Sequence, residues 1–184
     1  MLLGSDRAKL AKRHGATSLL DYKEKGFLPE AMFNFLALLG WSLDDKTEII
    51  SMEELVRHFS LERIVKSAAI FNIEKLTWMN GVYIRQLSHE NLADRLREVL
   101  NGQTAAEGAL KALSMPIDPE YLKTVVPLIQ DRLKTLREEE VWELCSFFFL
   151  ETPEYQGSLL PKGLDHLTTQ SALEATAQSL QTLE

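Results

Sequence analysis

Hydrophobic positions recur at helical spacing over most of this chain. The segment 30–39 is apolar around nearly its whole circumference, with Pro29 at a first helical position and Gly40 as the expected C-cap. A helix of this kind is buried on several sides, so the segment belongs to a sizeable body. No extended alternation of apolar and polar residues follows residue 50. The pattern predicts a mainly α protein, with at most short strands near its start.

Polar residues mark the expected helix starts. Ser51 and Glu54 have the spacing of a capping box, and so do Thr135 and Glu138. Asp118 precedes a proline, which is a typical combination of cap and first helical residue. Each of three further residues precedes a helical pattern and can accept free N–H groups of a first turn: Ser60, Asn72 and Ser88. These signals predict a succession of capped helices after residue 50.

Other stretches carry different expectations. Residues 1–28 read as loop or short extended pieces, and the segment 121–133 is expected to kink or break at Pro127. The range 136–150 reads as one long helix that ends in an apolar run. Helical spacing also occurs over 164–184, on a face without an obvious partner in the chain. A domain boundary is expected within 70–88, where the short early elements give way to longer helices.

Net charge limits the function classes. The 184 residues carry a formal charge of −7, which argues against a protein that coats nucleic acid by charge alone. An RNA-binding protein with this balance must confine its basic residues to one surface. The first 25 residues carry six basic and three acidic side chains, a weak sign of such a surface.

The motifs of familiar enzyme sites are missing from the sequence. No phosphate-binding glycine signature occurs, and no two of the four histidines have metal-ligand spacing, so no metal site is expected. The one cysteine, Cys145, lies beside three phenylalanines and is expected to be packed. No apolar stretch has the length of a membrane span, and no secretory leader opens the chain. These observations favour the cytoplasm.

One cationic segment stands out near the start. Lys9 and Lys12 are three residues apart and are followed by Arg13 and a glycine. Such a loop can gather around a polyphosphate and neutralise the charge that develops on leaving pyrophosphate. Spacing alone leaves a basic surface loop as the alternative.

Residues 9–16, Lys-Leu-Ala-Lys-Arg-His-Gly-Ala, resemble the second signature of class I aminoacyl-tRNA synthetases, the Lys-Met-Ser-Lys-Ser loop. The form is the one typical of bacterial-type glutamyl-tRNA synthetases. The resemblance continues through 21–42 and 67–84, and it becomes more diffuse in the helical pattern at 126–136. It is dense over roughly 3–100 and looser afterwards.

The resemblance implies roles for individual residues. In this family the second lysine of the loop contacts ATP and stabilises the activation transition state, a role that falls here to Lys12. Lys9 would support the loop and its phosphate field. Ala11 stands where the family usually has serine, which removes a hydroxyl from the loop. ATP and Mg²⁺ are therefore expected for the parent enzyme, with neither bound tightly to this chain.

The resemblance also implies a domain organisation. The family's His-Ile-Gly-His signature is absent, and so are the strands that bind ATP and glutamate, so the chain is expected to be a fragment that is inactive alone. Residues 1–75 would form the end of the catalytic body and the stem-contact region. Residues 76–184 would form a helical anticodon-binding region that is incomplete at its C-terminus. The implied partners are glutamate-acceptor tRNA, together with ATP and glutamate in the intact enzyme. No association with a membrane is expected, and the chain is expected to be a monomer.

Basic side chains are the candidate tRNA contacts. Eight are selected: Arg13, Arg63, Lys66, Lys75, Arg85, Arg132, Lys134 and Arg137. Trp78 and Tyr83 can stack on unpaired bases, but their apolar neighbours on a predicted helix favour packing in the core.

Two other function classes stay open. A stand-alone helical module can bind RNA or protein without ATP, and its affinity for tRNA would be indifferent to the anticodon. A structural helical adaptor is favoured mildly by the acidic charge. A shortened relative that glutamylates queuosine in tRNA shares the early motifs, but the long helical extension argues against it.

Overall fold

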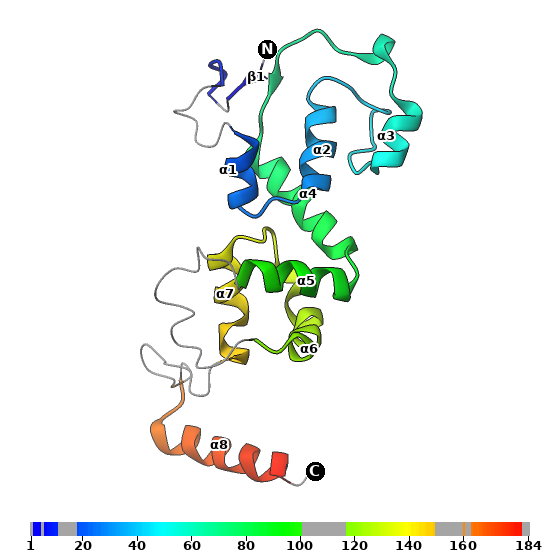
Figure 1. The fold of residues 1–184 in the computed structure, drawn as a ribbon. Helices are drawn as coiled ribbons and strands as arrows, with labels where there is room; N and C mark the ends of the chain where they lie inside the picture. Colours follow the sequence, from blue (N-terminus) through cyan, green and yellow to red (C-terminus); the bar gives the residue numbers. More distant parts are fainter. Residues whose placement is uncertain are drawn as a thin grey trace. The chain divides into compact units, whose positions relative to one another are not determined.

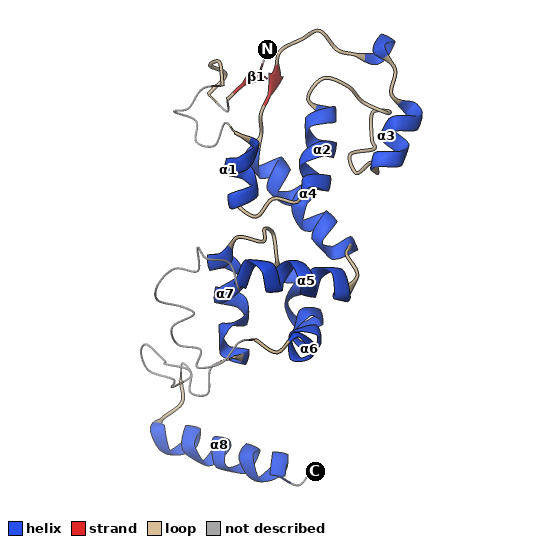
Figure 2. Cartoon of the chain, viewed as in Figure 1, coloured by secondary structure: helices blue, strands red, loops and turns tan. Residues whose placement is uncertain are grey.

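The computed structural model describes residues 2–4, 6–10, 18–100, 117–149, 160 and 163–181, and this part of the chain is mainly helical (Figures 1 and 2). Its α-helices are α1 (Leu19–Glu24), α2 (Pro29–Leu38), α3 (Met52–His58), α4 (Ile73–Gln86), α5 (His89–Leu100), α6 (Pro119–Ile129), α7 (Glu138–Cys145) and α8 (His166–Gln181). Short 3-10 helices span Leu61–Arg63, Gln130–Arg132 and Ser146–Phe148. The predicted mainly α fold with only short strands is confirmed.

The strands form a two-stranded parallel sheet. β1 (Leu2–Leu3) pairs with β2 (Ala69–Ile70), with Leu2 opposite Ala69. The chain then turns back, so that Lys9 forms an antiparallel bridge with Leu3. Residues near the start of the chain are therefore attached to the segment that leads into α4.

The chain divides into two compact units, residues 1–150 and 151–184. The described part of the second unit is dominated by α8, on which Leu167 and Leu173 are exposed. The first unit contains two main hydrophobic clusters. An aromatic one gathers residues of α1, α2 and α4 with Phe71, and an aliphatic one gathers residues of α5, α6 and α7.

Helix α4 contributes to both clusters. Leu76 and Met79 lie in the aromatic cluster, whereas Ile84 lies in the aliphatic one. All three side chains are fully buried. Burial of each side chain stabilises the fold by about 1.5–3 kcal/mol through the hydrophobic effect. Helix α4 is therefore the element around which the first unit is organised, as its central course in Figure 1 shows.

A buried polar contact joins α2 to α4. The side-chain oxygen of Asn34 accepts a hydrogen bond from the Ile50 backbone N–H at 2.9 Å. The Tyr83 hydroxyl lies 2.9 Å from both that oxygen and the Ile50 carbonyl. Burial raises the pKa of Tyr83, so the hydroxyl stays protonated and can donate. The packed position predicted for Tyr83 agrees with these contacts.

The capping residues predicted at several helix starts are confirmed. Ser51 and Glu54 form the predicted capping box of α3. Asn72 accepts from the Lys75 N–H at the start of α4, and Asp118 caps α6 ahead of Pro119. The predicted cap at Ser88 is confirmed by a bond from the Asn91 N–H.

Other local predictions are wrong. Helix α1 lies within the range expected to be loop, and Ser18 caps it together with Asp21. Helix α2 ends at Leu38 with Leu39 as its C-cap, and Gly40 lacks the positive φ of a glycine C-cap. Ser60 precedes only a 3-10 turn and makes no side-chain cap bond.

The second half of the first unit also departs from expectation. Helix α6 continues past Pro127 to Ile129 and then tightens into a 3-10 turn, so the predicted break falls two residues late. The expected helix over 136–150 is shorter, because α7 begins at Glu138 and gives way to a 3-10 turn at Ser146. Thr135 does not cap it, since the N-cap is Arg137.

Candidate nucleic-acid interface

Lys9 follows a tight turn close to β1. The Gly4 N–H donates to the Ala8 carbonyl at 2.8 Å, and Arg7 takes a φ of 60° within the turn. The Lys9 side chain is exposed and has no polar partner among the described residues. Ala11, Lys12 and Arg13 lie outside the described residues, so the structure describes only the first of the two lysines that were predicted to act on ATP.

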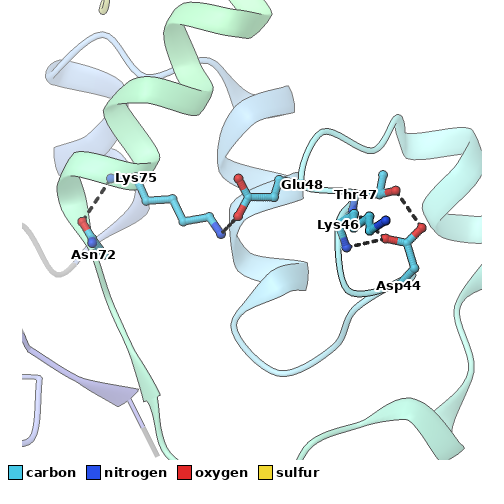
Figure 3. A network of polar contacts seen from close by, with 6 residues as sticks. All are labelled: Asp44, Lys46, Thr47, Glu48, Asn72 and Lys75. Carbon is cyan, nitrogen blue, oxygen red and sulfur yellow. Dashed lines mark hydrogen bonds and ion pairs between the residues drawn. The ribbon is translucent and has the colours of Figure 1, made fainter.

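Lys75 and Arg63 are among the predicted tRNA contacts that are engaged within the protein. The Lys75 ammonium pairs with Glu48 at 2.5 Å, while the Lys75 backbone donates to Asn72 (Figure 3). The Arg63 guanidinium donates to the Leu43 carbonyl at 2.8 Å. Lys66 is exposed without a polar partner in the described chain. Lys75 and Arg63 would each have to exchange or share a protein contact in order to bind RNA.

The turn before Glu48 is fixed by Asp44. Its carboxylate accepts from the backbone N–H groups of Lys46 and Thr47 and from the Thr47 hydroxyl (Figure 3). These hydrogen bonds favour the ionised form and lower the pKa of Asp44. Asp44 is therefore a structural acid of this turn, and its charge supports the loop that carries Glu48.

The Arg85 guanidinium and the Lys134 backbone both lie beside Gly81, although they belong to different elements. The Arg85 guanidinium and the Lys134 Cα both lie within 4 Å of the point that a Cβ on Gly81 would occupy. The Leu133 carbonyl lies there too, at 3.5 Å. The segment 133–137 therefore packs directly against α4 at Gly81, at a distance where a Cβ would make ordinary van der Waals contact with it. Both basic side chains are exposed.

The remaining predicted contacts lie on the same part of the chain. Arg132 is exposed at the end of the 3-10 turn after α6, and Arg137 pairs with Glu139 at 3.2 Å. The side chains of Arg85, Arg132 and Lys134 have no acidic partner among the described residues. We call these three residues the basic strip.

Asn80 holds the segment 133–137 against α4. Its side-chain oxygen accepts from the Leu28 N–H at 2.7 Å, and its amide donates to the Lys134 carbonyl at 2.7 Å. The Gly26 carbonyl accepts from the Leu136 N–H at 2.8 Å and lies 3.5 Å from the Asn80 amide. Asn80 is fully buried, where unmade hydrogen bonds are costly. We call this arrangement the Asn80 junction.

Glu140 binds the same segment from its other side. One carboxylate oxygen accepts from the Lys134 N–H at 2.8 Å and from the Thr135 N–H at 3.3 Å. The other accepts from the Thr135 hydroxyl. The Thr135 hydroxyl thus donates to Glu140 within α7 and accepts from the Arg137 N–H at 3.3 Å. The N-cap of α7 is nevertheless Arg137 and not the predicted Thr135.

The core position predicted for Trp78 is wrong. Its side chain is 48% exposed, so it does not pack in the core as predicted. The residues that shape the basic strip were not selected from the sequence at all: Asn80, Gly81 and Glu140. One signal could have identified Asn80, because it interrupts the apolar positions Leu76, Met79 and Ile84 of a helix.

Cys145 is buried, as predicted, and burial raises its pKa to about 12. It is therefore a packed thiol and no nucleophile. No group of three or more metal-binding side chains gathers within the described ranges. No helix in the described part of the chain is long and apolar enough to cross a membrane.

Two family models match the chain. Residues 1–78 match the catalytic domain of class I tRNA synthetases (E and Q), and residues 91–184 match an anticodon binding domain. A glutamate–tRNA ligase of Dehalococcoides mccartyi is 49% identical over 186 residues, which cover all of this chain and 36% of that protein. One from Moorella thermoacetica is 40% identical over 183 residues, with the same two coverages.

Solved structures agree with the sequence relatives. A glutamate tRNA ligase from Elizabethkingia meningosepticum, crystallised with its amino acid, is 26% identical and superposes with a TM-score of 0.65. The match covers all of this chain and 36% of that one. A glutamate-tRNA synthetase from Elizabethkingia anophelis gives a TM-score of 0.61 at 26% identity, over 90% of this chain and 32% of its own. The chain thus spans about a third of the length of these relatives.

Proposed function

The chain belongs to the glutamyl-tRNA synthetase family of class I tRNA synthetases, and from this premise we propose that it supplies the tRNA-binding part of a glutamate–tRNA ligase. Residues 1–75 would end the catalytic body and contact the tRNA stem, and residues 76–184 would approach the anticodon arm. The complete enzyme would activate glutamate with ATP and transfer it to tRNA. A monomeric, cytoplasmic protein belongs to the same proposal.

The observation that carries the proposal is the basic strip. The chain is acidic overall, yet the Arg85 guanidinium and the Lys134 backbone both lie beside Gly81, and neither side chain has an acidic partner among the described residues. Arg132 is close to Lys134 along the chain. Unneutralised cations on one surface are what a phosphate backbone requires of an acidic protein. Arg137 and Lys75 can join the contact only by sharing or exchanging their carboxylate partners.

ATP forms a further part of the proposal. An exposed ammonium such as that of Lys9, which has no polar partner among the described residues, is suited to a phosphate oxygen. Lys9 and Lys12 would hold the polyphosphate and stabilise the charge of the leaving pyrophosphate. Mg²⁺ would accompany the nucleotide, since this ion is commonly bound through substrate phosphates.

A tRNA titration tests the proposal. Binding of a glutamate tRNA, and of the same tRNA with an altered anticodon, is measured at two salt concentrations. We expect salt-sensitive binding that is tighter for the unaltered anticodon. Lys134→Ala and Arg85→Ala should each weaken binding to both tRNAs and lower the salt slope by about one unit.

Lys46→Ala provides the matched control, because Lys46 is an exposed lysine outside the basic strip and its loss changes the net charge equally. Equal effects of Lys46→Ala and Lys134→Ala would refute the basic strip as the contact. Salt-sensitive binding that ignores the anticodon would indicate stem contact alone or a general RNA-binding module. Absence of tRNA binding would refute the proposed function for this chain.

A further inference from the structure

We propose that Glu140 is a positioning residue for RNA binding, which holds the backbone of Lys134 so that the basic strip is ordered before RNA arrives. The inference rests on the proposed function. Glu140 is an acidic residue close to the basic strip, where removal of a negative charge would ordinarily strengthen the binding of phosphate. If Glu140 positions Lys134, its removal would instead weaken RNA binding.

Glu140 is well placed to fix this segment. Its carboxylate accepts three hydrogen bonds, from the Lys134 N–H at 2.8 Å, the Thr135 N–H at 3.3 Å and the Thr135 hydroxyl at 2.5 Å. Hydrogen bonds to an ionised acceptor are roughly twice as strong as neutral ones. All three donors belong to Lys134 and Thr135, so the carboxylate is directed at this segment of the protein.

The opposite side of the same residue is held as well. The Lys134 carbonyl accepts from the Asn80 amide at 2.7 Å. Leu133 and Thr135 on either side are buried. Both backbone polar groups of Lys134 are thus fixed, while its ammonium has no partner in the described chain. The backbone is ordered and the charge is left available.

An ordered backbone improves binding because the entropy of ordering is lost during folding and not on association. Loss of the Glu140 carboxylate would free the Lys134 and Thr135 amides and let the segment fluctuate. Lys134 would then have to be ordered by the RNA itself. We expect a three- to tenfold loss of affinity, about the range that corresponds to fixing one long side chain.

The experiment compares two acids on one helix. Glu140→Ala and Glu143→Ala remove the same charge from α7, but the Glu143 side chain is exposed and makes no hydrogen bond in the described chain. We expect Glu140→Ala to weaken tRNA binding, whereas Glu143→Ala leaves it unchanged or tightens it. Glu140→Gln keeps one oxygen for the Lys134 N–H and should recover most of the affinity.

A double-mutant cycle separates positioning from general stability. When Lys134→Ala is already present, Glu140→Ala should weaken tRNA binding little further, because the residue that it positions is gone. Amide hydrogen exchange of the free chain supplies a second measurement. The Lys134 and Thr135 amides should exchange faster in Glu140→Ala and at the original rate in Glu143→Ala.

The outcomes are distinguishable. If the unmodified chain binds no tRNA, the proposed function fails and the positioning role fails with it. If it binds and Glu140→Ala binds equally or more tightly, only the positioning role is overturned. Should Glu140→Ala be unfolded by circular dichroism, Thr135→Val removes one donor and should weaken binding in the same direction. Unchanged binding by that variant would also overturn the positioning role.

Discussion

Gly26→Ala tests the close approach on which the Asn80 junction depends. Gly26 has a φ of +75°, and a Cβ added there would lie 2.1 Å from the Arg137 nitrogen and 2.2 Å from the Leu136 carbonyl carbon. Both contacts are backbone atoms, so no side-chain rotation can relieve them. The segment 133–137 would have to move away.

The expected loss follows from these contacts. An alanine in the left-handed region costs about 1–2 kcal/mol. Movement of the segment breaks the Leu136 N–H bond to the Gly26 carbonyl and strains the Asn80 bond to Lys134. Each buried group left unpaired costs about 1–3 kcal/mol. The free energy of unfolding should therefore fall by at least about 3 kcal/mol.

Urea denaturation followed by circular dichroism measures this change. With a typical urea dependence of about 1–3 kcal/mol per molar, the midpoint should fall by about 1–3 M. Gly40→Ala is the matched control, because Gly40 lacks a positive φ and its nearest new contact would be the Val65 carbonyl at 4.0 Å. A Gly26→Ala midpoint equal to that of Gly40→Ala would refute the close approach.

Three further expectations follow. The Cys145 thiol, with its pKa raised to about 12 by burial, should resist a thiol-specific chromogenic reagent at pH 8 until urea unfolds the chain; rapid native reaction would contradict its burial. The Arg95 hydrogen bonds lower the pKa of Glu30, so their stabilisation is present above the unfolded pKa of about 4.3 and is lost as pH falls through the lower folded pKa. Glu30→Gln should flatten the acid side of a stability-against-pH curve, and an unchanged curve would contradict the contact. Trp41→Phe, at 3% exposure, should lower the free energy of urea unfolding by more than about 1 kcal/mol, whereas Trp78→Phe should change it by less than about 0.5 kcal/mol; equal losses would contradict the exposed position of Trp78.

Helix starts were predictable where the capping chemistry is local. Ser51, Asn72 and Asp118 bond to N–H groups two or three residues further along, and this distance is visible in the sequence. Such caps identify α3, α4 and α6 without knowledge of the fold. The class of fold follows from the same helical periodicity.

Predictions failed where a distant segment competes for the same groups. Thr135 has the spacing of a capping box with Glu138, yet its hydroxyl bonds to Glu140, and Leu136 donates to Gly26. These contacts hold the backbone before α7 in an extended conformation, which includes the N-cap Arg137. The helix therefore begins at Glu138, two residues later than its apolar pattern suggests. Short helix α1 was missed in a range that contains glycines at both ends.

The candidate site was predictable by residue type and not by arrangement. Arg85 and Lys134 were both selected as basic residues, but the position of the Lys134 backbone beside α4 depends on its long-range bond to Asn80. The half-exposed position of Trp78 likewise depends on which face of α4 is covered. Lys12 and Arg13 stay predictions, as they lie outside the described residues.

The Asn80 junction has a consequence for the order of folding events. Asn80 bonds to Leu28, which lies 52 residues before it, and to Lys134, which lies 54 residues after it. Closing a loop of that size opposes the contact by about 3–4 kcal/mol of chain entropy, before any additional constant. Two such closures meet at one side chain, so the junction should form after the transition state, when the helices are largely assembled. Its loss would then accelerate unfolding and leave the folding rate nearly unchanged.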